Sequence, residues 1–279
     1  MPELPEVETI VRALRQGGRN GPSILGRMVE GAQVFWDKSV AAPGAEEFIR
    51  RSAGQTVQSV GRRGKFIVIA LQPDTLLVHL RMSGDLRVEA VLDEQGQPAA
   101  SLAHDRLLLN LSGGMRLVFN DARKFGRAWL LDEPQQVLEK LGPEPLDEGF
   151  APTDLYQRLQ NTHRRLKPLL LDQTFVAGLG NIYTDESLHL ARLHPNRLSH
   201  SLTLTEAERL WSAIRLTLQE GIDRNGASID CVYRGGSFQI RFRVYQRTGE
   251  PCPVCGAPVI RTLVGQRGTH FCPVCQLES

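Results

Sequence analysis

The chain has 279 residues, 41% of them hydrophobic, and its 33 Lys and Arg against 31 Asp and Glu leave a net charge of +2. This length suits one large domain or two ordinary ones, and the hydrophobic fraction is enough for substantial cores. No apolar run approaches the ~18–20 residues of a membrane span, and the acidic, proline-containing start does not resemble a signal peptide. We therefore expect a soluble protein of a reducing cytoplasm.

The first predicted element is a helix over residues 5–16. Pro5 suits the first helical position, apolar residues recur at helical spacing from Val7 to Leu14, and Gly17-Gly18 ends the pattern. From about residue 56 to 131 the pattern changes to short strands, expected at 65–71, 76–81, 86–91, 106–111 and 115–120. Ser112-Gly113-Gly114 marks a hairpin between the last two strands. This part predicts an antiparallel β-sandwich with one helix in front of it.

The second half of the chain is predicted to be helical. Residues 132–153 are rich in Pro, Gly and acid and indicate an interdomain linker. Further on, Thr205 and Glu208 have the spacing of a capping box, an apolar stripe runs from Leu210 to Leu218, and Gly221 marks the helix end.

Two CxxC pairs near the end of the chain predict a metal site. Cys252-Pro-Val-Cys255 and Cys272-Pro-Val-Cys275 are separated by 16 residues, which suits a four-thiolate zinc site better than two surface disulfides. Four thiolates leave no open coordination position, so we expect one structural Zn²⁺. The insert between the pairs has an arginine between two glycines and no acid, as suits a hairpin that reaches into a nucleic acid. The fifth cysteine, Cys231, is expected to be a small buried apolar residue.

Basic residues are concentrated in stretches without acids. Residues 48–73 contain five Lys and Arg, while 155–171 and 231–249 contain four each, and none of the three stretches contains Asp or Glu. An ordinary solvated surface would mix the two signs, as residues 206–224 do. The pattern predicts a basic face that binds phosphate.

The first residues suggest a nucleophile. If Met1 is removed, Pro2 presents a free secondary amine, and an α-amino group has a pKa of roughly 8 against about 10.4 for lysine. Such an amine can attack a sugar C1′ or an aldehyde and form an iminium, and the adjacent Glu3 can carry a proton. Taken alone, a Met-Pro start is more often accidental.

Four blocks of sequence give this start a context. Pro2-Glu-Leu-Pro-Glu-Val-Glu-Thr9, Asp121-Ala-Arg-Lys-Phe-Gly126, the stretch from Leu170 to Tyr183, and the terminal stretch from Cys252 to Gln276 resemble formamidopyrimidine-DNA glycosylases, in the same order. The resemblance implies an α+β fold. An N-terminal antiparallel β-sandwich with flanking helices is expected over 1–132, a linker over 133–153, a helix-two-turn-helix DNA-binding domain over 154–240 and a four-Cys zinc hairpin over 241–279.

The resemblance also implies catalytic roles for four residues. Pro2 matches the nucleophile that forms the Schiff base, and Glu3 its acid–base partner. Lys65 matches a lysine that contacts phosphate beside the lesion and assists β-elimination. Arg267 matches the hairpin arginine that grips phosphate and is linked to δ-elimination. Both cations stand in acid-free surroundings, which independently suits phosphate contacts.

Further matched positions are expected to contact DNA. Met82, Arg123 and Phe125 match three residues that fill the gap left when a base is extruded from the stack. The other matched contacts are His104, His163, Lys167 and Asn181. The family usually has Lys or Arg where this chain has His163, and Arg164 is an alternative for that contact. A lesion-capping loop expected at 227–243 looks a few residues short, which leaves the preferred damaged base open.

Together these features predict a bifunctional DNA glycosylase and abasic-site lyase that removes oxidised purines, 8-oxoguanine and formamidopyrimidines, from duplex DNA. Its partner would be double-stranded DNA with a damaged base or abasic site, and we expect a monomer in the bacterial cytoplasm, associated with the nucleoid through DNA. One alternative is an endonuclease VIII-like relative that acts on oxidised pyrimidines. The sequence context of Leu4 and Val7, together with the pair Arg123 and Phe125, favours the purine enzyme instead. The other is a non-catalytic zinc protein that binds damaged DNA, which Pro2, Glu3, Lys65 and Arg267 together disfavour.

Overall fold

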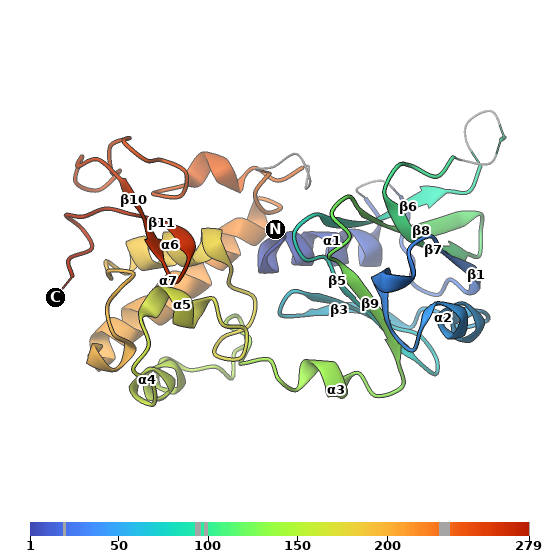
Figure 1. Cartoon of the computed structure of the whole chain (residues 1–279), viewed down its shortest axis with the longest axis horizontal. Coiled ribbons are helices and arrows are strands. Elements are labelled where there is room, and N and C mark those ends of the chain that lie inside the picture. Colours follow the sequence, from blue (N-terminus) through green and yellow to red (C-terminus); the bar gives the residue numbers. More distant parts are fainter. Residues whose placement is uncertain (19–20, 93–95, 98–99, 229–234, 279) are drawn as a thin grey trace. The chain divides into compact units, whose positions relative to one another are not determined.

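The computed structural model describes the whole chain except residues 19–20, 93–95, 98–99, 229–234 and 279 (Figure 1). The described residues form two compact units. The first, called the sheet unit, comprises residues 1–2 and 6–139. The second, called the helical unit, comprises residues 3–5, 140–228 and 235–279. Cys231 and the middle of the predicted 227–243 loop fall outside the described residues.

The sheet unit contains two β-sheets. Its elements are α1 (Leu4–Gln16, whose first two residues belong to the helical unit), β1 (Val29–Val34), η1 (Asp37–Ser39), β2 (Val40–Ala42), α2 (Ala45–Ser52), β3 (Ser59–Arg63), β4 (Phe66–Ala70), β5 (Thr75–His79), β6 (Gly84–Ala90), β7 (Asp105–Leu111), β8 (Met115–Asp121), β9 (Arg127–Leu131) and α3 (Gln135–Leu138). One sheet has the order β1-β7-β8-β6 and the other β2-β9-β5-β4-β3. The β2–β9 pair is parallel, and the other pairs described are antiparallel.

An apolar core joins the two sheets. Inward-facing residues of both sheets pack with Val7, Ile10, Val11 and Leu14 of α1, which are at most 2% exposed. This confirms the predicted β-sandwich and the apolar stripe predicted for the helix over residues 5–16. The five predicted strands correspond to β4 to β8, and β7 and β8 form the predicted hairpin. Strands β1, β2 and β3 are short or polar and gave no sequence signal strong enough to be predicted, whereas β9 is as long as β4 and mostly apolar and was missed.

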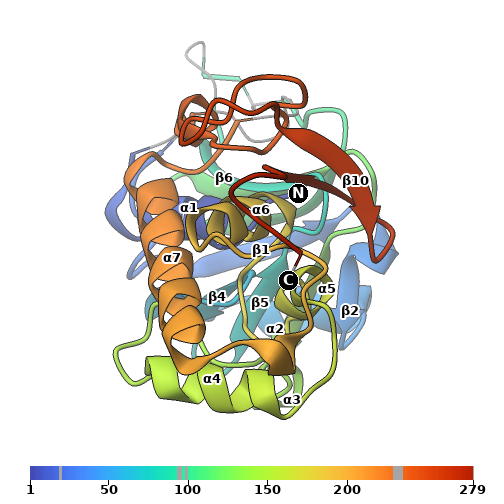
Figure 2. The same cartoon turned by 90° about the vertical axis from the view of Figure 1, so that its left-hand side faces the viewer.

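The helical unit is built around one buried helix. Its elements are α4 (Pro152–Gln160), α5 (Leu166–Leu170), α6 (Asn181–Leu190), η2 (Ser199–Ser201), α7 (Leu204–Asp223), η3 (Phe238–Arg241), β10 (Ile260–Val264) and β11 (Arg267–Phe271). Residues Ile182 to His189 of α6 are all buried. Helix α6 contacts α7 and the β10–β11 hairpin, and Figure 2 shows it between them.

Buried acids on α6 hold the segments around it. The Asp185 carboxylate forms an ion pair with the fully buried Lys167 and accepts the His270 backbone N–H at 3.0 Å. The Glu186 carboxylate accepts three backbone N–H groups of residues 243–245 at 2.8 to 3.0 Å. Burial raises the pKa of Glu186 above its usual range, while those hydrogen bonds oppose the shift. The Glu186 contacts thus hold residues 243–245, and the Asp185 contact holds β11 against α6.

The start and end of α7 differ from the prediction. The capping box is formed by Thr203 and Glu206, not by Thr205 and Glu208, because the helix begins one residue before Thr205. The apolar stripe is buried as predicted. Gly221 does not end the helix, which continues to Asp223; a Cβ at this position would lie 2.5 Å from a ring carbon of Tyr183. The glycine thus permits the close approach of α6 and α7.

Within the described ranges, no helix has both the length and the apolar character that spanning a bilayer requires.

Replacing Thr203 by Ala should lower the free energy of unfolding by about 1 kcal/mol, because the Glu206 N–H loses its side-chain acceptor. Thr205→Ala, the same change two residues later, lies inside the helix and serves as the control. Denaturant unfolding of both variants measures the difference. Equal losses would contradict the observed cap.

Candidate functional site

The Glu3 side chain is bound at the N-terminus of α6. Its carboxylate accepts the backbone N–H groups of Gly180 at 2.8 Å, Ile182 at 3.0 Å and Tyr183 at 3.3 Å. The first N–H groups of a helix have no partner within the helix, and the helix dipole favours a negative charge there. Only 2% of Glu3 is exposed. The residue next to Pro2 is therefore fixed by backbone geometry.

Two glycines make room for this segment. A Cβ on Gly180 would lie 2.3 Å from the Glu3 carboxyl carbon, and a Cβ on Gly178 would lie 2.5 Å from a methyl carbon of Leu4. Gly178 also has a φ of 92°, and its carbonyl accepts the Leu4 N–H at 3.1 Å. Glycines ahead of a helix start often allow close approach of the backbone to a phosphate. Here they allow close approach of the N-terminal segment of the chain itself.

Lys65 lies in a turn, not at the start of a strand as predicted. Arg63 pairs with Phe66, so Gly64 and Lys65 form a two-residue hairpin loop between β3 and β4. Gly64 takes φ 56°, as the first loop position of a tight hairpin often requires. Lys65 is only 5% exposed, so its position is defined by packing.

His79 near Lys65 was not singled out from the sequence. Burial, together with the charges of Arg81 and Lys65, lowers the pKa of His79 to about 3. The ring is therefore neutral at physiological pH. Its Nδ1 accepts the Arg81 backbone N–H at 3.0 Å, which leaves Nε2 as the protonated donor nitrogen. The sequence alone could not have indicated this residue, because its lowered pKa arises mainly from burial in the folded chain.

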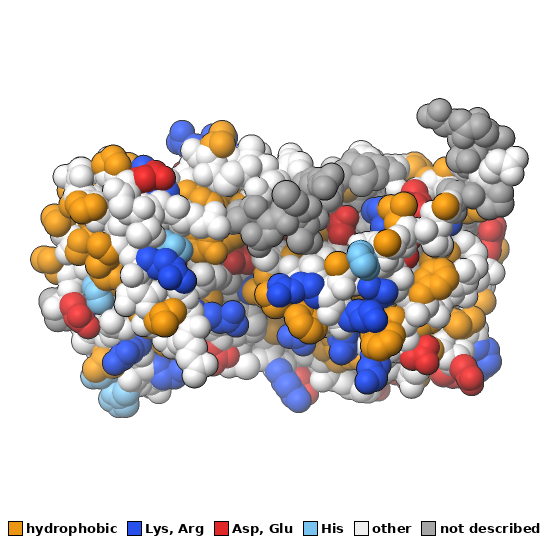
Figure 3. Space-filling model, turned by 45° about the horizontal axis from the view of Figure 1, so that its top comes forward, with side chains coloured by type: hydrophobic (Ala, Val, Ile, Leu, Met, Phe, Trp, Pro, Cys, Tyr) orange, Lys and Arg blue, Asp and Glu red, His pale blue; other side chains and the backbone are white. Residues whose placement is uncertain are grey.

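Met82, Arg123 and Phe125 form an exposed cluster, called the tip cluster. Met82 is 41% and Phe125 51% exposed. The Arg123 guanidinium donates to the Met82 sulfur at 3.7 Å and lies 5.7 Å from the centre of the Phe125 ring. On the right-hand half of Figure 3, which shows part of the sheet unit, Lys and Arg side chains gather beside exposed hydrophobic ones. The structure thus joins three residues that are predicted to act together.

The loop that carries Arg123 and Phe125 is held by its neighbours. The Asp121 carboxylate accepts the Gly126 N–H at 2.7 Å and the Arg123 N–H at 3.2 Å, and it also accepts the Ser83 hydroxyl. The Lys124 ammonium lies 4.2 Å from the centre of the Trp36 ring, a strong cation–π geometry. Sequence reasoning missed Asp121 and Trp36 as supports, because their partners are distant in sequence.

His104, the remaining predicted contact of the sheet unit, is exposed and has φ 78°. Its Nδ1 lies 3.2 Å from an Arg106 guanidinium nitrogen.

Arg267 is exposed at the tip of the β10–β11 hairpin, as predicted. Val264 pairs with Arg267 across the two-residue loop Gly265-Gln266, whose φ values of 55° and 62° suit a type I′ turn. The Asn181 amide donates to the Gly268 carbonyl at 3.0 Å, so the start of α6 and the hairpin tip are linked. Among the described residues, its buried Oδ1 has no hydrogen-bond partner.

Lys167 is fully buried, although it was predicted as a DNA contact. Its ammonium is paired with Asp185. Burial lowers the pKa of Lys167, while the charges of Asp185 and Glu3 oppose the shift and that of Arg267 adds to it. Glu3, Lys167 and Arg267 thus influence one another electrostatically around the start of α6.

His163 and Arg164, the alternative basic contacts, are both exposed. The Arg164 guanidinium is paired with Asp172 at 2.6 Å. His163 Nδ1 lies 3.0 Å from His200 Nδ1.

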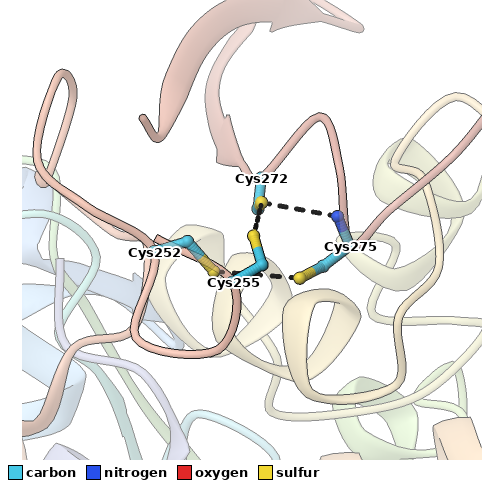
Figure 4. Close-up of side chains that lie close together, drawn as sticks. All are labelled: Cys252, Cys255, Cys272 and Cys275. Carbon is cyan, nitrogen blue, oxygen red and sulfur yellow. Dashed lines mark hydrogen bonds between the residues drawn. The ribbon is translucent and has the colours of Figure 1, made fainter. Parts of the chain in front are cut away.

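The four predicted cysteines converge at one point. Their sulfur atoms all lie within 4.8 Å of one another, with 3.4 Å between Cys255 and Cys272 and 3.9 Å between Cys252 and Cys275 (Figure 4). Tetrahedral zinc with ~2.3 Å bonds would separate its sulfurs by ~3.8 Å.

The surroundings of the cysteines also suit a thiolate site. Backbone N–H groups of Val254 and Cys275 point at the sulfurs of Cys252 and Cys272 at 3.5 and 3.4 Å. His189 Nε2 lies 3.3 Å from the Cys252 sulfur, where its N–H could donate to a zinc-bound thiolate and orient it. The residues fit one structural Zn²⁺.

Comparisons with known proteins agree with this geometry. Residues 1–128 match the formamidopyrimidine-DNA glycosylase N-terminal domain, 141–232 the formamidopyrimidine-DNA glycosylase H2TH domain, and 249–277 a zinc finger found in FPG and IleRS. The chain is 44% identical to the formamidopyrimidine-DNA glycosylases of Pelotomaculum thermopropionicum and Chloroflexus aurantiacus, over 99% of its own length and 99% and 98% of theirs.

Solved structures give the same result. The chain is similar to MutM in complex with DNA containing carbocyclic 8-oxo-G (TM-score 0.89) and to the Lactococcus lactis enzyme bound to abasic-site DNA (TM-score 0.88). Each is 37% identical, and each match covers 99% of this chain and 100% of the other. The resemblance inferred from four sequence blocks is confirmed over the full length: the chain belongs to the formamidopyrimidine-DNA glycosylase family.

Proposed function

We propose that the protein is a bifunctional DNA glycosylase and abasic-site lyase of base excision repair. It removes oxidised purines from duplex DNA through a Schiff base on Pro2 and then nicks the strand by β,δ-elimination. The relatives crystallised with 8-oxo-G, Fapy-dG and abasic-site DNA support this substrate class. The observation that carries the proposal is the binding of Glu3 by three N–H groups at α6, because it fixes the residue next to the nucleophile.

The reaction at Pro2 proceeds by substitution at the sugar. Once Met1 is removed, the amine nitrogen bonds to C1′ as the bond from C1′ to the damaged base breaks, and the base leaves with a proton. Opening of the sugar ring gives an iminium, which acts as the electron sink when C2′ loses a proton and the 3′ phosphate departs. Glu3, held beside Pro2, is suited to move protons during these steps.

Lys65 and Arg267 supply positive charge for these steps. Lys65 is held by packing in its turn, and Arg267 is presented by a tight hairpin on the zinc-bound segment. A fixed cation can hold a phosphate beside the reacting sugar and stabilise the phosphate leaving group. We assign β-elimination support to Lys65 and δ-elimination support to Arg267.

The tip cluster is proposed to fill the space left by the extruded base. Met82 and Phe125 offer exposed apolar surface to the neighbouring bases, and the Arg123 guanidinium can donate to the acceptor-rich edge of the widowed cytosine. His104, His163 and Asn181 complete the proposed DNA contacts, and Lys167 acts through Asp185. The protein would act as a monomer on nucleoid DNA in the bacterial cytoplasm.

Borohydride should trap the protein on duplexes that contain 8-oxoguanine or an abasic site, because reduction of the iminium makes the bond to Pro2 permanent. Mass spectrometry of the digested adduct locates the modified residue. An adduct on Lys65 would overturn the assignment of the nucleophile.

Gly180→Ala should slow trapping and base excision by roughly 100-fold, because the added Cβ displaces the Glu3 carboxylate and misplacement of about 1 Å is costly. Gly31→Ala, in β1, is the matched control, since a Cβ there meets no atom of the described residues within 4 Å. Single-turnover rates are measured on variants whose zinc content and thermal unfolding show a folded protein. A folded Gly180→Ala variant with an unchanged rate would argue against the role of this contact.

Lys124→Met should reduce the preference for lesion:C over lesion:A duplexes about two- to fivefold, the worth of a cation–π contact of ~0.5–1 kcal/mol. The substitution removes the cation–π contact with Trp36 that helps to position the loop carrying Arg123. Lys38→Met is the control, because Lys38 lies 6.0 Å from the same ring. Single-turnover rates at saturating enzyme give the preference. An equal loss on both duplexes with a weaker salt dependence would make Lys124 a phosphate contact instead.

A further inference from the structure

Two imidazole rings meet on the surface of the helical unit. His163, just before α5, and His200, in η2, have their Nδ1 atoms 3.0 Å apart, and their ring centres are separated by 4.2 Å in an edge-on arrangement. A contact between two ring nitrogens at this distance holds one proton between two lone pairs. A metal ion can replace that proton, because neutral imidazole is a common metal ligand.

The backbone holds the two rings together. Ser199, the neighbour of His200, donates its hydroxyl to the Thr162 carbonyl at 2.5 Å and its N–H to the Arg164 carbonyl at 2.9 Å. These two bonds lie on either side of His163 in the sequence. The chain segments that carry the rings are therefore fixed before any ligand arrives, which reduces the entropy lost on binding.

Two of the arginines near the pair in the sequence have acidic partners. Arg164 is paired with Asp172, and Arg197 is paired with Glu206. Their charges are partly neutralised, so they repel a bound cation less than unpaired arginines would. The Arg165 guanidinium instead donates to the neutral Asn196 Oδ1 at 3.4 Å, so its charge opposes metal binding.

The geometry is close to that of a chelate. With Zn–N bonds of ~2.0–2.1 Å in a tetrahedron, two ligand nitrogens lie ~3.3 Å apart, so the Nδ1 atoms need to separate by only a few tenths of an ångström. We propose that His163 and His200 form a second metal site, which binds one divalent ion such as Zn²⁺ through both Nδ1 atoms. Because His163 is exposed, the remaining coordination positions stay open to water or to a phosphate oxygen.

The consequence for DNA rests on the proposed function. His163 stands where the family resemblance places Lys or Arg. A neutral imidazole lacks that positive charge, and a bound metal ion would restore it. The ion also has open coordination positions that a phosphate oxygen of the DNA backbone can occupy. The site would thus make one phosphate contact of this chain dependent on metal.

Calorimetric titration of Zn²⁺ into the full chain already carrying one zinc ion tests the site itself. A second equivalent is expected, and His163→Ala and His200→Ala should each remove it. His104→Ala is the matched control: this histidine is also exposed, but its ring contacts an arginine, so the second equivalent should remain. Absence of a second equivalent, or its survival in both pair variants, would overturn the proposal.

Binding to abasic-site DNA tests the consequence. One equivalent of added Zn²⁺ should tighten wild-type binding and steepen its salt dependence by ~0.9, the value for one further neutralised phosphate. His200→Ala should not respond, and His163→Lys should bind tightly without added metal. A second zinc that leaves DNA affinity unchanged overturns the role in DNA binding. If no variant binds DNA, the proposed function fails, and the calorimetry alone still decides the metal site.

Discussion

The burial of α6 is the constraint on which the helical unit depends. A helix that is covered on nearly every side needs partners for the polar groups it carries, because an unpaired buried group costs about 1–3 kcal/mol. In α6 several of these partners are distant parts of the chain, although a few buried side-chain atoms, among them Asn181 Oδ1, have no partner among the described residues. Its free N–H groups bind Glu3, and Asn181, Asp185 and His189, each four residues apart, reach Gly268, His270 and Cys252. The polar requirements of one helix thus bring together the N-terminal segment, the hairpin and the zinc ligands.

This arrangement explains why the proposed chemistry uses residues from both ends of the sequence. Glu3 and Arg267 are separated by most of the chain, yet the helix that binds the Glu3 carboxylate also holds the hairpin next to Arg267 through Asn181. A change inside α6 would therefore disturb both. The zinc ion stabilises the hairpin from its other end, since thiolate coordination couples metal binding to the folding of this segment.

Sequence patterns were sufficient where apolar residues form a continuous run, an alternation or a helical stripe. Strands β4, β5, β7 and β8 contain apolar runs, β6 alternates, and α1 and α7 carry apolar stripes, while the CxxC spacing identified the metal ligands. The patterns were insufficient for α6, whose residues 182–189 are all buried, so no polar face defines a period. Lys65 was placed in a strand because the loop at Gly64 is only two residues long. The cap at Thr203 was missed because Thr205 offers the same spacing to a glutamate.

Resemblance and local physics supply different information about a residue, and Lys167 shows the difference. Its match to a family position suggests a contact with DNA, whereas its complete burial against Asp185 makes direct contact with solvent-exposed phosphate unfavourable in this structure. Asp185 also binds the His270 backbone in β11, so the charge of Lys167 bears on the hairpin that presents Arg267. Without that ammonium, the buried Asp185 carboxylate would lose its lysine partner and keep only its contacts to His270, a larger penalty than the loss of one surface contact. A lysine can thus be required for DNA binding through the position of another residue, without touching the DNA itself.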